Sequence, residues 1–273
     1  MISTENKVLD CHTGHSDDRL VSDRHVPKNK HGSGKVGDMK TEIDHLVVLA
    51  ADLESGVQWC EATLGITPGP GGEHELYGTH NRLFKIATPT NPLAYLEIIA
   101  INPHAVRPKK KQPTRWFDMD DLALRAAVAN EPRLVHFVAS TPDLLAARMA
   151  LRMVAIDRGP AVHASRRTSK GVLNWQISVR ADGQRLFNGA LPSLIQWGKP
   201  VATDPLRLHP RNSLPRSGVT LHSLAVQHPS ADKLQAAYEA IGLSHVTVSE
   251  GEPNITATLQ TPKGLVQLHS QGV

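Results

Sequence analysis

The segment Ile43-Asp44-His45-Leu46-Val47-Val48 decides the fold, because two similar segments follow it along the chain. They are Leu134-Val135-His136-Phe137-Val138-Ala139 and Leu221-His222-Ser223-Leu224-Ala225-Val226. All three are apolar, are typical of β-strands and carry one histidine near the start. A segment that returns in this way predicts a chain built from repeated units.

A helix is predicted after each of these strands, over 52–64, 141–151 and 230–241. Each stretch begins with Asp, Thr or Ser, whose side chains favour a helix start. A glycine, Gly65 or Gly242, follows the first and the third stretch and favours a helix end.

More strand-like segments follow each helix, and the last of each set is alike: 95–99, 193–197 and 265–268. The repeated unit is therefore a strand, a helix and then two or three strands. A small open sheet leaves an apolar face in water, so one unit must pair with another. We predict an α+β fold of paired βαβββ modules with a third, degenerate module. The predicted segments are a polar tail at 1–40, a first module at 41–102, a connector at 103–132, a second module at 133–198, a Pro/Arg-rich linker at 199–218 and the third module at 219–273.

Composition narrows the classes of function. The chain has 273 residues, with 30 Lys and Arg against 26 Asp and Glu, and this small excess is too weak to indicate nucleic-acid binding. Two cysteines cannot build a disulfide framework or a four-cysteine zinc site. No apolar run is long enough to span a membrane, and the N-terminus lacks the apolar core of a secretory signal. We therefore expect a cytoplasmic protein with no nucleic-acid and no membrane partner.

Residues 1–40 differ from the rest of the chain. They hold seven Lys or Arg and six Asp or Glu, with few large apolar residues. Such a segment buries too little apolar surface to offset the entropy of ordering, so we expect a disordered tail. Its four histidines are expected to be solvated. The 15 histidines of the whole chain, set against 4% aromatic residues, still prompt a search for metal sites in the modules.

Polar residues recur at matching points of the repeat. Glu97 interrupts the apolar strand 95–101, and a carboxylate there is costly unless it is hydrogen-bonded, paired or bound to a metal. His45 and His136 lie in the first strands of their units, and Gln196 lies in the last strand of the second. Two imidazoles, a carboxylate and an amide oxygen suit Zn, Ni, Mn, Fe or Co.

Plainer interpretations of these residues stay open. A single histidine in an apolar strand is often a core group with satisfied hydrogen bonds, and Glu97 alone can pair with an arginine. The third unit offers His222 and Gln267 without an acid, which favours a structural role there.

The first module resembles the glyoxalase-like domain of the vicinal oxygen chelate superfamily, which includes glyoxalases, bleomycin resistance proteins and extradiol dioxygenases. The resemblance rests on 43–48, on Leu64-Gly65-Ile66, on Gly78-Thr79-His80-Asn81-Arg82-Leu83 and on Tyr95-Leu96-Glu97-Ile98. It extends more weakly over 115–198. It implies a cupped mixed sheet around a pocket, with metal ligands from the first and last strand of each module.

Carried over to this sequence, the implied metal ligands are His45, Glu97, His136 and Gln196. Gln196 stands where these enzymes typically place a second glutamate, which often serves as the base in proton transfer. The departure puts glyoxalase isomerase chemistry itself in doubt. Glu97 is the candidate catalytic residue, as a ligand or as a base.

The expected function is the binding of a small oxygen-rich metabolite between the modules, with a divalent metal as Lewis acid for isomerase, lyase or dioxygenase chemistry. The glycine-rich loop before Glu97 and the connector contribute the candidate substrate-binding residues His74, Thr79, Asn81 and Trp116. Alternatively, Gly-Thr-His-Asn is only a turn. A metal-free binding or resistance protein is the alternative function, and a regulatory module that docks a partner is a third. Three units leave one without an internal partner, which favours a homodimer.

Overall fold

The computed structural model describes residues 39–106, 113–198 and 204–271. All of them belong to one compact unit, Lys35–Val273. The predicted tail at 1–40 therefore lies outside the described residues, apart from its last two. Within the described part, no helix combines the length and the hydropathy needed to cross a membrane.

The first two units have the predicted order of elements. The first contains β1 (Glu42–Leu49), α1 (Leu53–Leu64), β2 (Gly69–His74), β3 (Thr79–Lys85) and β4 (Tyr95–Ile101). The second contains β5 (Arg133–Ser140), α3 (Leu144–Met153), β6 (Ala161–Thr168), β7 (Gly171–Ser178) and β8 (Ser193–Trp197). The connector between them holds a helix that the sequence pattern did not predict, α2 (Leu122–Asn130), which begins after an Asp121 cap.

Local signals explain where the first helix begins and ends. The Asp52 carboxylate accepts a hydrogen bond from Ser55 N at 2.8 Å, while Asp52 N donates to Ser55 Oγ at 3.4 Å. This capping box satisfies donors that the helix itself leaves free. Gly65 ends the helix with φ 76°, a left-handed conformation that suits glycine. The predicted start and end are confirmed.

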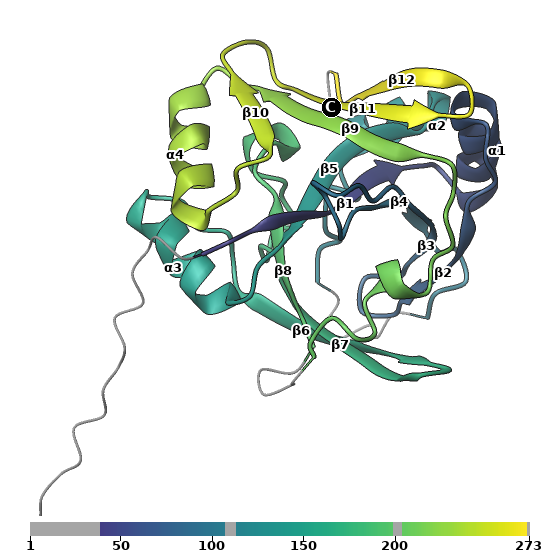
Figure 1. Cartoon of the computed structure of the whole chain (residues 1–273), viewed down its shortest axis with the longest axis horizontal. Coiled ribbons are helices and arrows are strands. Elements are labelled where there is room, and N and C mark those ends of the chain that lie inside the picture. Colours follow the sequence, from purple (N-terminus) through teal and green to yellow (C-terminus); the bar gives the residue numbers. More distant parts are fainter. Residues whose placement is uncertain (1–38, 107–112, 199–203, 272–273) are drawn as a thin grey trace, which may run out of the picture. The chain divides into compact units, whose positions relative to one another are not determined.

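The two modules share one eight-stranded sheet, ordered β2-β3-β4-β1-β5-β8-β7-β6. In each module the first strand runs parallel to the last, as β1 beside β4 and β5 beside β8. The antiparallel pair of β1 and β5 joins the modules in the middle. The sheet curls around its inner face, which carries His45 and Val47 (Figure 1). The paired modules and the mixed sheet are confirmed.

The third unit repeats the order of elements with a different strand order. It contains β9 (Thr220–Gln227), α4 (Ala231–Ile241), β10 (Val246–Ser249), β11 (Asn254–Thr261) and β12 (Gly264–His269). Its sheet is ordered β10-β9-β11-β12, so its last strand lies at an edge instead of beside its first strand. The unit resembles the modules in its order of elements, but it does not extend their sheet.

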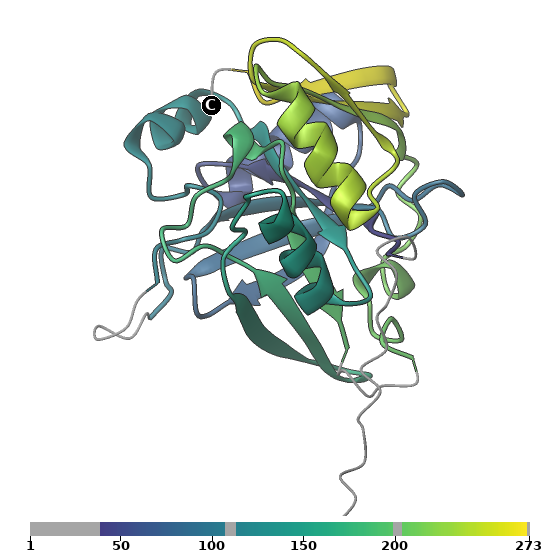
Figure 2. The same ribbon diagram turned by 90° about the vertical axis from the view of Figure 1, so that its left-hand side faces the viewer.

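The third unit packs against the outer face of the large sheet. β11 and β12 contact β5, and α4 packs beside α3 (Figure 2). One buried cluster contains both Leu221 and Leu259 from the third unit and Leu134 and Phe137 from β5. The third unit therefore buries its apolar face within the chain. The homodimer stays a prediction.

The inner face has its own apolar cluster. Val47 and Ile99 from the first module meet Ile195 and Trp197 from the second, together with Trp116 and its neighbours from the connector. The connector thus closes one side of the inner face, and the candidate site lies among these residues.

Candidate functional site

An irregularity in β1 brings two polar side chains to the inner face. The register of β1 against β5 shifts between Ile43 and His45, so Asp44 is the extra residue of a β-bulge. A bulge breaks the strict alternation of side chains between the two faces. Asp44 consequently points to the same side as His45 and is fully buried there.

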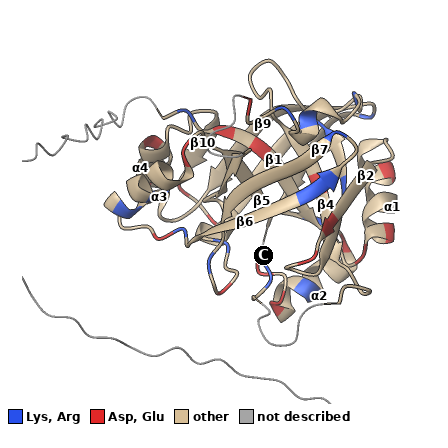
Figure 3. Ribbon diagram, turned by 90° about the horizontal axis from the view of Figure 1, so that it is seen from below, with Lys and Arg blue, Asp and Glu red and all other residues tan. Residues whose placement is uncertain are grey.

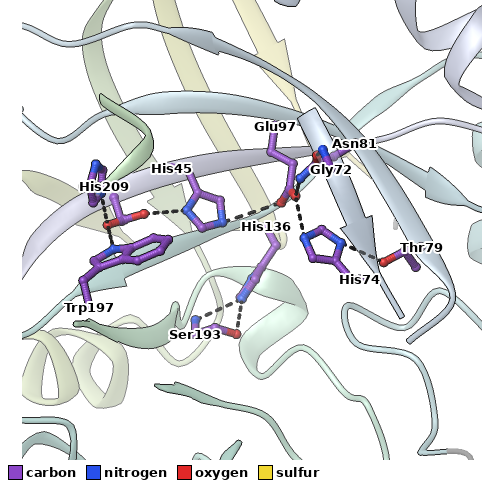
Figure 4. A network of polar contacts seen from close by, with 11 residues as sticks. His45, Gly72, His74, Thr79, Asn81, Glu97, His136, Ser193, Trp197 and His209 are labelled. Carbon is purple, nitrogen blue, oxygen red and sulfur yellow. Dashed lines mark hydrogen bonds and ion pairs between the residues drawn. The ribbon is translucent and has the colours of Figure 1, made fainter. Parts of the chain in front are cut away.

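Asp44 is the centre of a buried polar network that orients His45. Its Oδ1 accepts from His45 Nδ1 at 2.7 Å, and its Oδ2 accepts from Trp197 Nε1 at 2.7 Å and contacts His209 Nε2 at 3.0 Å (Figure 4). Burial alone raises the pKa of Asp44, but the charges and hydrogen bonds of His209 and His45 outweigh burial and hold that pKa below its ordinary value. The ionised carboxylate keeps the proton of His45 on Nδ1, so Nε2 faces the cavity.

Glu97 is the second polar centre. It lies on β4 with 5% of its surface exposed, and its Oε2 lies 3.6 Å from His45 Nε2. Asn81 Nδ2 donates to Glu97 Oε1 at 2.5 Å, while Asn81 Oδ1 accepts from Gly72 N at 2.7 Å. The chain from Gly72 through Asn81 therefore fixes the position of the carboxylate.

His74 completes this group from the end of β2. Its Nε2 lies 4.0 Å from Glu97 Oε1, and its Nδ1 shares a hydrogen bond of 3.0 Å with Thr79 Oγ1. Burial lowers the pKa of His74 to about 4; the Glu97 charge opposes this shift, and the Arg166 charge adds to it. His74 is therefore a neutral imidazole at neutral pH.

The cavity beside these groups is small and lies between the modules. It has a volume of about 50 Å³ and opens beside a groove of about 850 Å³. The two spaces share His74, Trp116, Arg166, Trp175 and Ile177. Tyr95 stacks on the His45 ring at a centroid distance of 4.6 Å and forms another part of the wall. A small polar group fits inside, and a larger remainder fits the groove.

His136, a predicted metal ligand, has other partners. Its Nδ1 donates to Gly189 O at 2.8 Å, and its Nε2 accepts from Ser193 N at 3.0 Å (Figure 4). The side chain is completely buried, and burial together with the Arg158 charge holds its pKa well below the ordinary value. Both ring nitrogens are therefore engaged in hydrogen bonds within the second module.

Gln196, the other ligand predicted from the second module, points to the opposite face of the sheet. Its Oε1 accepts from Leu144 N at 3.0 Å, at the start of α3, while Ile195 and Trp197 line the cavity. The structure thus brings His45 and Glu97 together, whereas His136 and Gln196 make their hydrogen bonds to partners in the second module.

A divalent metal has only part of the expected ligand set. Among the residues that the structure describes, no group of three or more His, Cys, Asp or Glu side chains is arranged to hold a metal ion. The donor chemistry of His45 and Glu97 suits a metal, but the second module contributes no ligand to them. The residues present do not fit the four-ligand set that the resemblance implies.

The predicted substrate-binding residues take different positions. His74, Asn81 and Trp116 line the cavity, whereas Thr79 acts on it through His74. Glu97 has no Lys or Arg within ion-pair distance in the described part of the chain, so the arginine pairing considered for it is not what the structure shows.

Sequence reasoning did not place Asp44, His209 or Arg166 in the site. The alternation of side chains did not predict that Asp44 faces the cavity, because the bulge changes the face to which it points. A charged residue within an apolar strand was nevertheless a signal of a functional or structural role. His209 comes from the Pro/Arg-rich linker, just before the short 3-10 helix Pro210–Asn212, yet it is fully buried. Arg166 gave no signal in sequence, because it lies in a strand of mixed polar residues.

The comparisons with known proteins agree with this geometry. A family model described as the glyoxalase-like domain matches residues 43–242. The chain belongs to this family. The match covers both modules and the first part of the third unit, so the recognition of the vicinal oxygen chelate fold is confirmed. No curated protein sequence matches the chain.

Several solved structures are similar to the chain at low sequence identity. A hypothetical protein from Staphylococcus aureus is 16% identical, with 84% of each chain covered and a TM-score of 0.52. Methylmalonyl-CoA epimerase from Streptomyces coelicolor, in complex with 2-nitronate-propionyl-CoA, is 20% identical over 57% of this chain and 94% of its own, with a TM-score of 0.37. The epimerase from Mycobacterium tuberculosis is 17% identical over 57% and 85%, with a TM-score of 0.29.

Proposed function

We propose that the cavity binds a small oxygen-rich metabolite and that Glu97 removes a proton from a carbon next to its carbonyl group, as in an isomerase or a lyase. One observation carries the proposal. The Glu97 carboxylate is buried at the cavity wall, and its neighbours there are the imidazoles of His45 and His74 and the amide of Asn81. Burying a carboxylate without a cationic partner costs free energy, and a role as general base accounts for its presence at the cavity wall.

Each neighbour of Glu97 has a task in this proposal. The amide of Asn81 donates to Oε1, which leaves Oε2 to accept the proton of the substrate. As the carbon–hydrogen bond breaks, its electrons move into the carbon–carbon bond and the carbonyl oxygen becomes an enolate. Neutral His74 can donate from Nε2 to that oxygen when Thr79 donates to Nδ1.

His45 acts as the proton relay. Asp44 holds the proton on Nδ1, so the lone pair of Nε2 faces Glu97 across 3.6 Å. A proton collected by Glu97 passes to His45 and returns to a different atom or face of the enolate. The negative charge of Asp44 stabilises the imidazolium while it carries the proton.

The test is exchange of carbon-bound hydrogen in D2O. Pyruvate, 2-oxobutanoate and phenylpyruvate are the probes, and proton NMR follows the loss of their C3 signals above the rate in buffer. We expect catalysed exchange with at least one probe and a loss of about hundredfold or more in Glu97→Gln. Glu54→Gln is the matched control, because Glu54 is an exposed carboxylate on α1. Full exchange in Glu97→Gln overturns the proposal.

Elemental analysis of the same proteins separates a base from a metal ligand. The proposal predicts exchange that survives dialysis against EDTA. About one equivalent of Mn, Fe, Co, Ni or Zn in the wild type, lost in both His45→Ala and Glu97→Gln, would make Glu97 a ligand and overturn its assignment as the base.

A binding protein without catalysis is the second candidate. The groove supports it, because Tyr77, Trp116 and Trp175 give it an aromatic lining suited to a flat ligand. In that case a ligand that raises the melting temperature of the wild type raises it equally in Glu97→Gln, and no probe exchanges.

A further inference from the structure

We infer that the ligand of this cavity carries an anionic oxygen group, a carboxylate or a phosphate, which binds to the guanidinium of Arg166 and the indole N–H of Trp116. This inference deepens the proposed function, because it names the class of ligand for the same site. It rests on the position of two donors that the acid–base groups do not use.

Arg166 reaches the cavity from the second module. It lies on β6 at one edge of the sheet, and its Nη1 would be 2.0 Å from a Cβ atom added to Gly72 of β2 at the other edge. The two edges therefore approach each other here, and the basic part of β6 lies beside β2 (Figure 3). The missing side chain of Gly72 leaves the space that the guanidinium occupies.

Arg166 has no carboxylate partner in the described part of the chain, in contrast to several other arginines. Arg115 pairs with Asp120, Arg180 with Asp182 and Arg185 with Asp118. Arg166 is half-buried and lines both the cavity and the groove, and its side chain makes no ion pair or hydrogen bond with the described residues. Its charge acts to lower the pKa of both His74 and Tyr95, two residues that line the same cavity.

Trp116 supplies the second donor. Only 6% of its surface is exposed, and its Nε1 is buried without a hydrogen-bond partner in the described structure. A buried N–H without an acceptor costs free energy, so an acceptor on the ligand would stabilise the complex. Trp116 lines the same cavity as Arg166.

The chemistry of these donors selects an anion. A guanidinium presents several N–H groups in a plane and binds carboxylate or phosphate oxygens through two parallel hydrogen bonds. The acids nearest along the groove, Glu73 and Glu75, are exposed and do not neutralise the guanidinium by an ion pair. The anionic group then lies at the junction of cavity and groove, and the reacting carbon lies near Glu97.

Fluorescence titration tests the inference without requiring turnover. Three of the four tryptophans, Trp116, Trp175 and Trp197, line the cavity, so a bound ligand changes the intrinsic emission. The probes are phenylacetate, phenyl phosphate and the neutral phenylacetamide. We expect the wild type to bind at least one anion about tenfold or more tightly than the amide, and Arg166→Gln to lose that preference. The anion that binds more tightly identifies the ligand as a carboxylate or a phosphate.

Two further variants refine the test. Trp116→Phe keeps an aromatic ring and removes the indole N–H, so it should weaken binding of the anion several-fold and leave binding of the amide unchanged. Arg82→Gln is the control for lost charge, because Arg82 is exposed on β3 and does not line the cavity. Equal affinity for anions and amide in the wild type, or an unchanged preference in Arg166→Gln, overturns the inference.

The anion preference measured by fluorescence does not depend on whether Glu97 is the base. Glu97→Gln should still prefer the anions, because it keeps Arg166 and Trp116. Anion preference without any exchange of pyruvate would therefore support the anion site and contradict Glu97 as the base. Exchange without anion preference would support Glu97 as the base and contradict the anion site.

Discussion

The two modules share one topology but put different chemistry on the inner face. The first contributes Asp44, His45, His74, Asn81 and Glu97, which contact one another around the cavity. The second contributes mainly apolar side chains, such as Trp175, Ile177, Ile195 and Trp197, with Arg166 as its charged residue at the cavity. The shared topology thus fixes where the strands lie, while the side chains of each copy can differ. In this chain the first module supplies the polar groups of the cavity, and the second supplies mainly the apolar side chains that shape it.

The largest expected effect is on the polar network of the first module. Asp44→Ala removes the acceptor shared by His45, Trp197 and His209 and leaves buried polar groups unpaired. We expect a loss of about 3–5 kcal/mol in the free energy of unfolding, measured by urea denaturation. Asp232→Ala on α4 is the surface control. A loss below about 1 kcal/mol would show that the network does not hold the first module together.

The next prediction separates the two histidines at equivalent points of the repeat. His136→Ala leaves the Gly189 carbonyl and the Ser193 N–H without their partner, at a cost of about 1–3 kcal/mol for each buried group. It should retain the exchange rate per folded molecule, whereas His45→Ala should slow exchange about hundredfold. If His136→Ala instead abolishes exchange while the protein stays folded, the second module does contribute to the chemistry.

These two histidines also show what the sequence can and cannot predict. The repeat identifies both, and the start and end of α1 follow from Asp52 and Gly65 alone. Sequence does not reveal the bulge at Asp44, because bulges depend on pairing between strands. It does not reveal the register that pairs Val138 with Ser193, which helps to decide where Gln196 points. Hydrogen-bond partners such as Gly189, 53 residues after His136, appear only once the chain is folded.

The pH dependence of stability sharpens the contrast further. The pKa of His74 is about 4 in the folded protein against 6.5 for the free side chain, so between these values the unfolded chain binds more protons. Stability therefore falls as pH falls from 6.5 to 4, by at most about 1.4 kcal/mol per pH unit from this group. His136 acts in the same direction, and Asp44 adds a loss below about pH 4, where the unfolded carboxyl is protonated. Between pH 7 and 4.5, the free energy of unfolding measured by urea denaturation should decline less steeply in His74→Gln than in the wild type. An equally steep decline in both proteins would contradict the lowered pKa of His74.

The smallest effects are expected where the edges of the two modules meet. An alanine Cβ at position 71 would lie 2.2 Å from the Asn81 carbonyl oxygen, which is backbone and cannot move freely. At position 72 it would meet only the flexible end of the Arg166 side chain. Gly71→Ala should therefore displace Asn81 and slow exchange, whereas Gly72→Ala should leave exchange unchanged and weaken phenylacetate or phenyl phosphate several-fold. Parallel NMR exchange and fluorescence titration would measure both effects. If both variants instead lose exchange and anion binding to the same extent, then Glu97 of the first module and Arg166 of the second do not act independently.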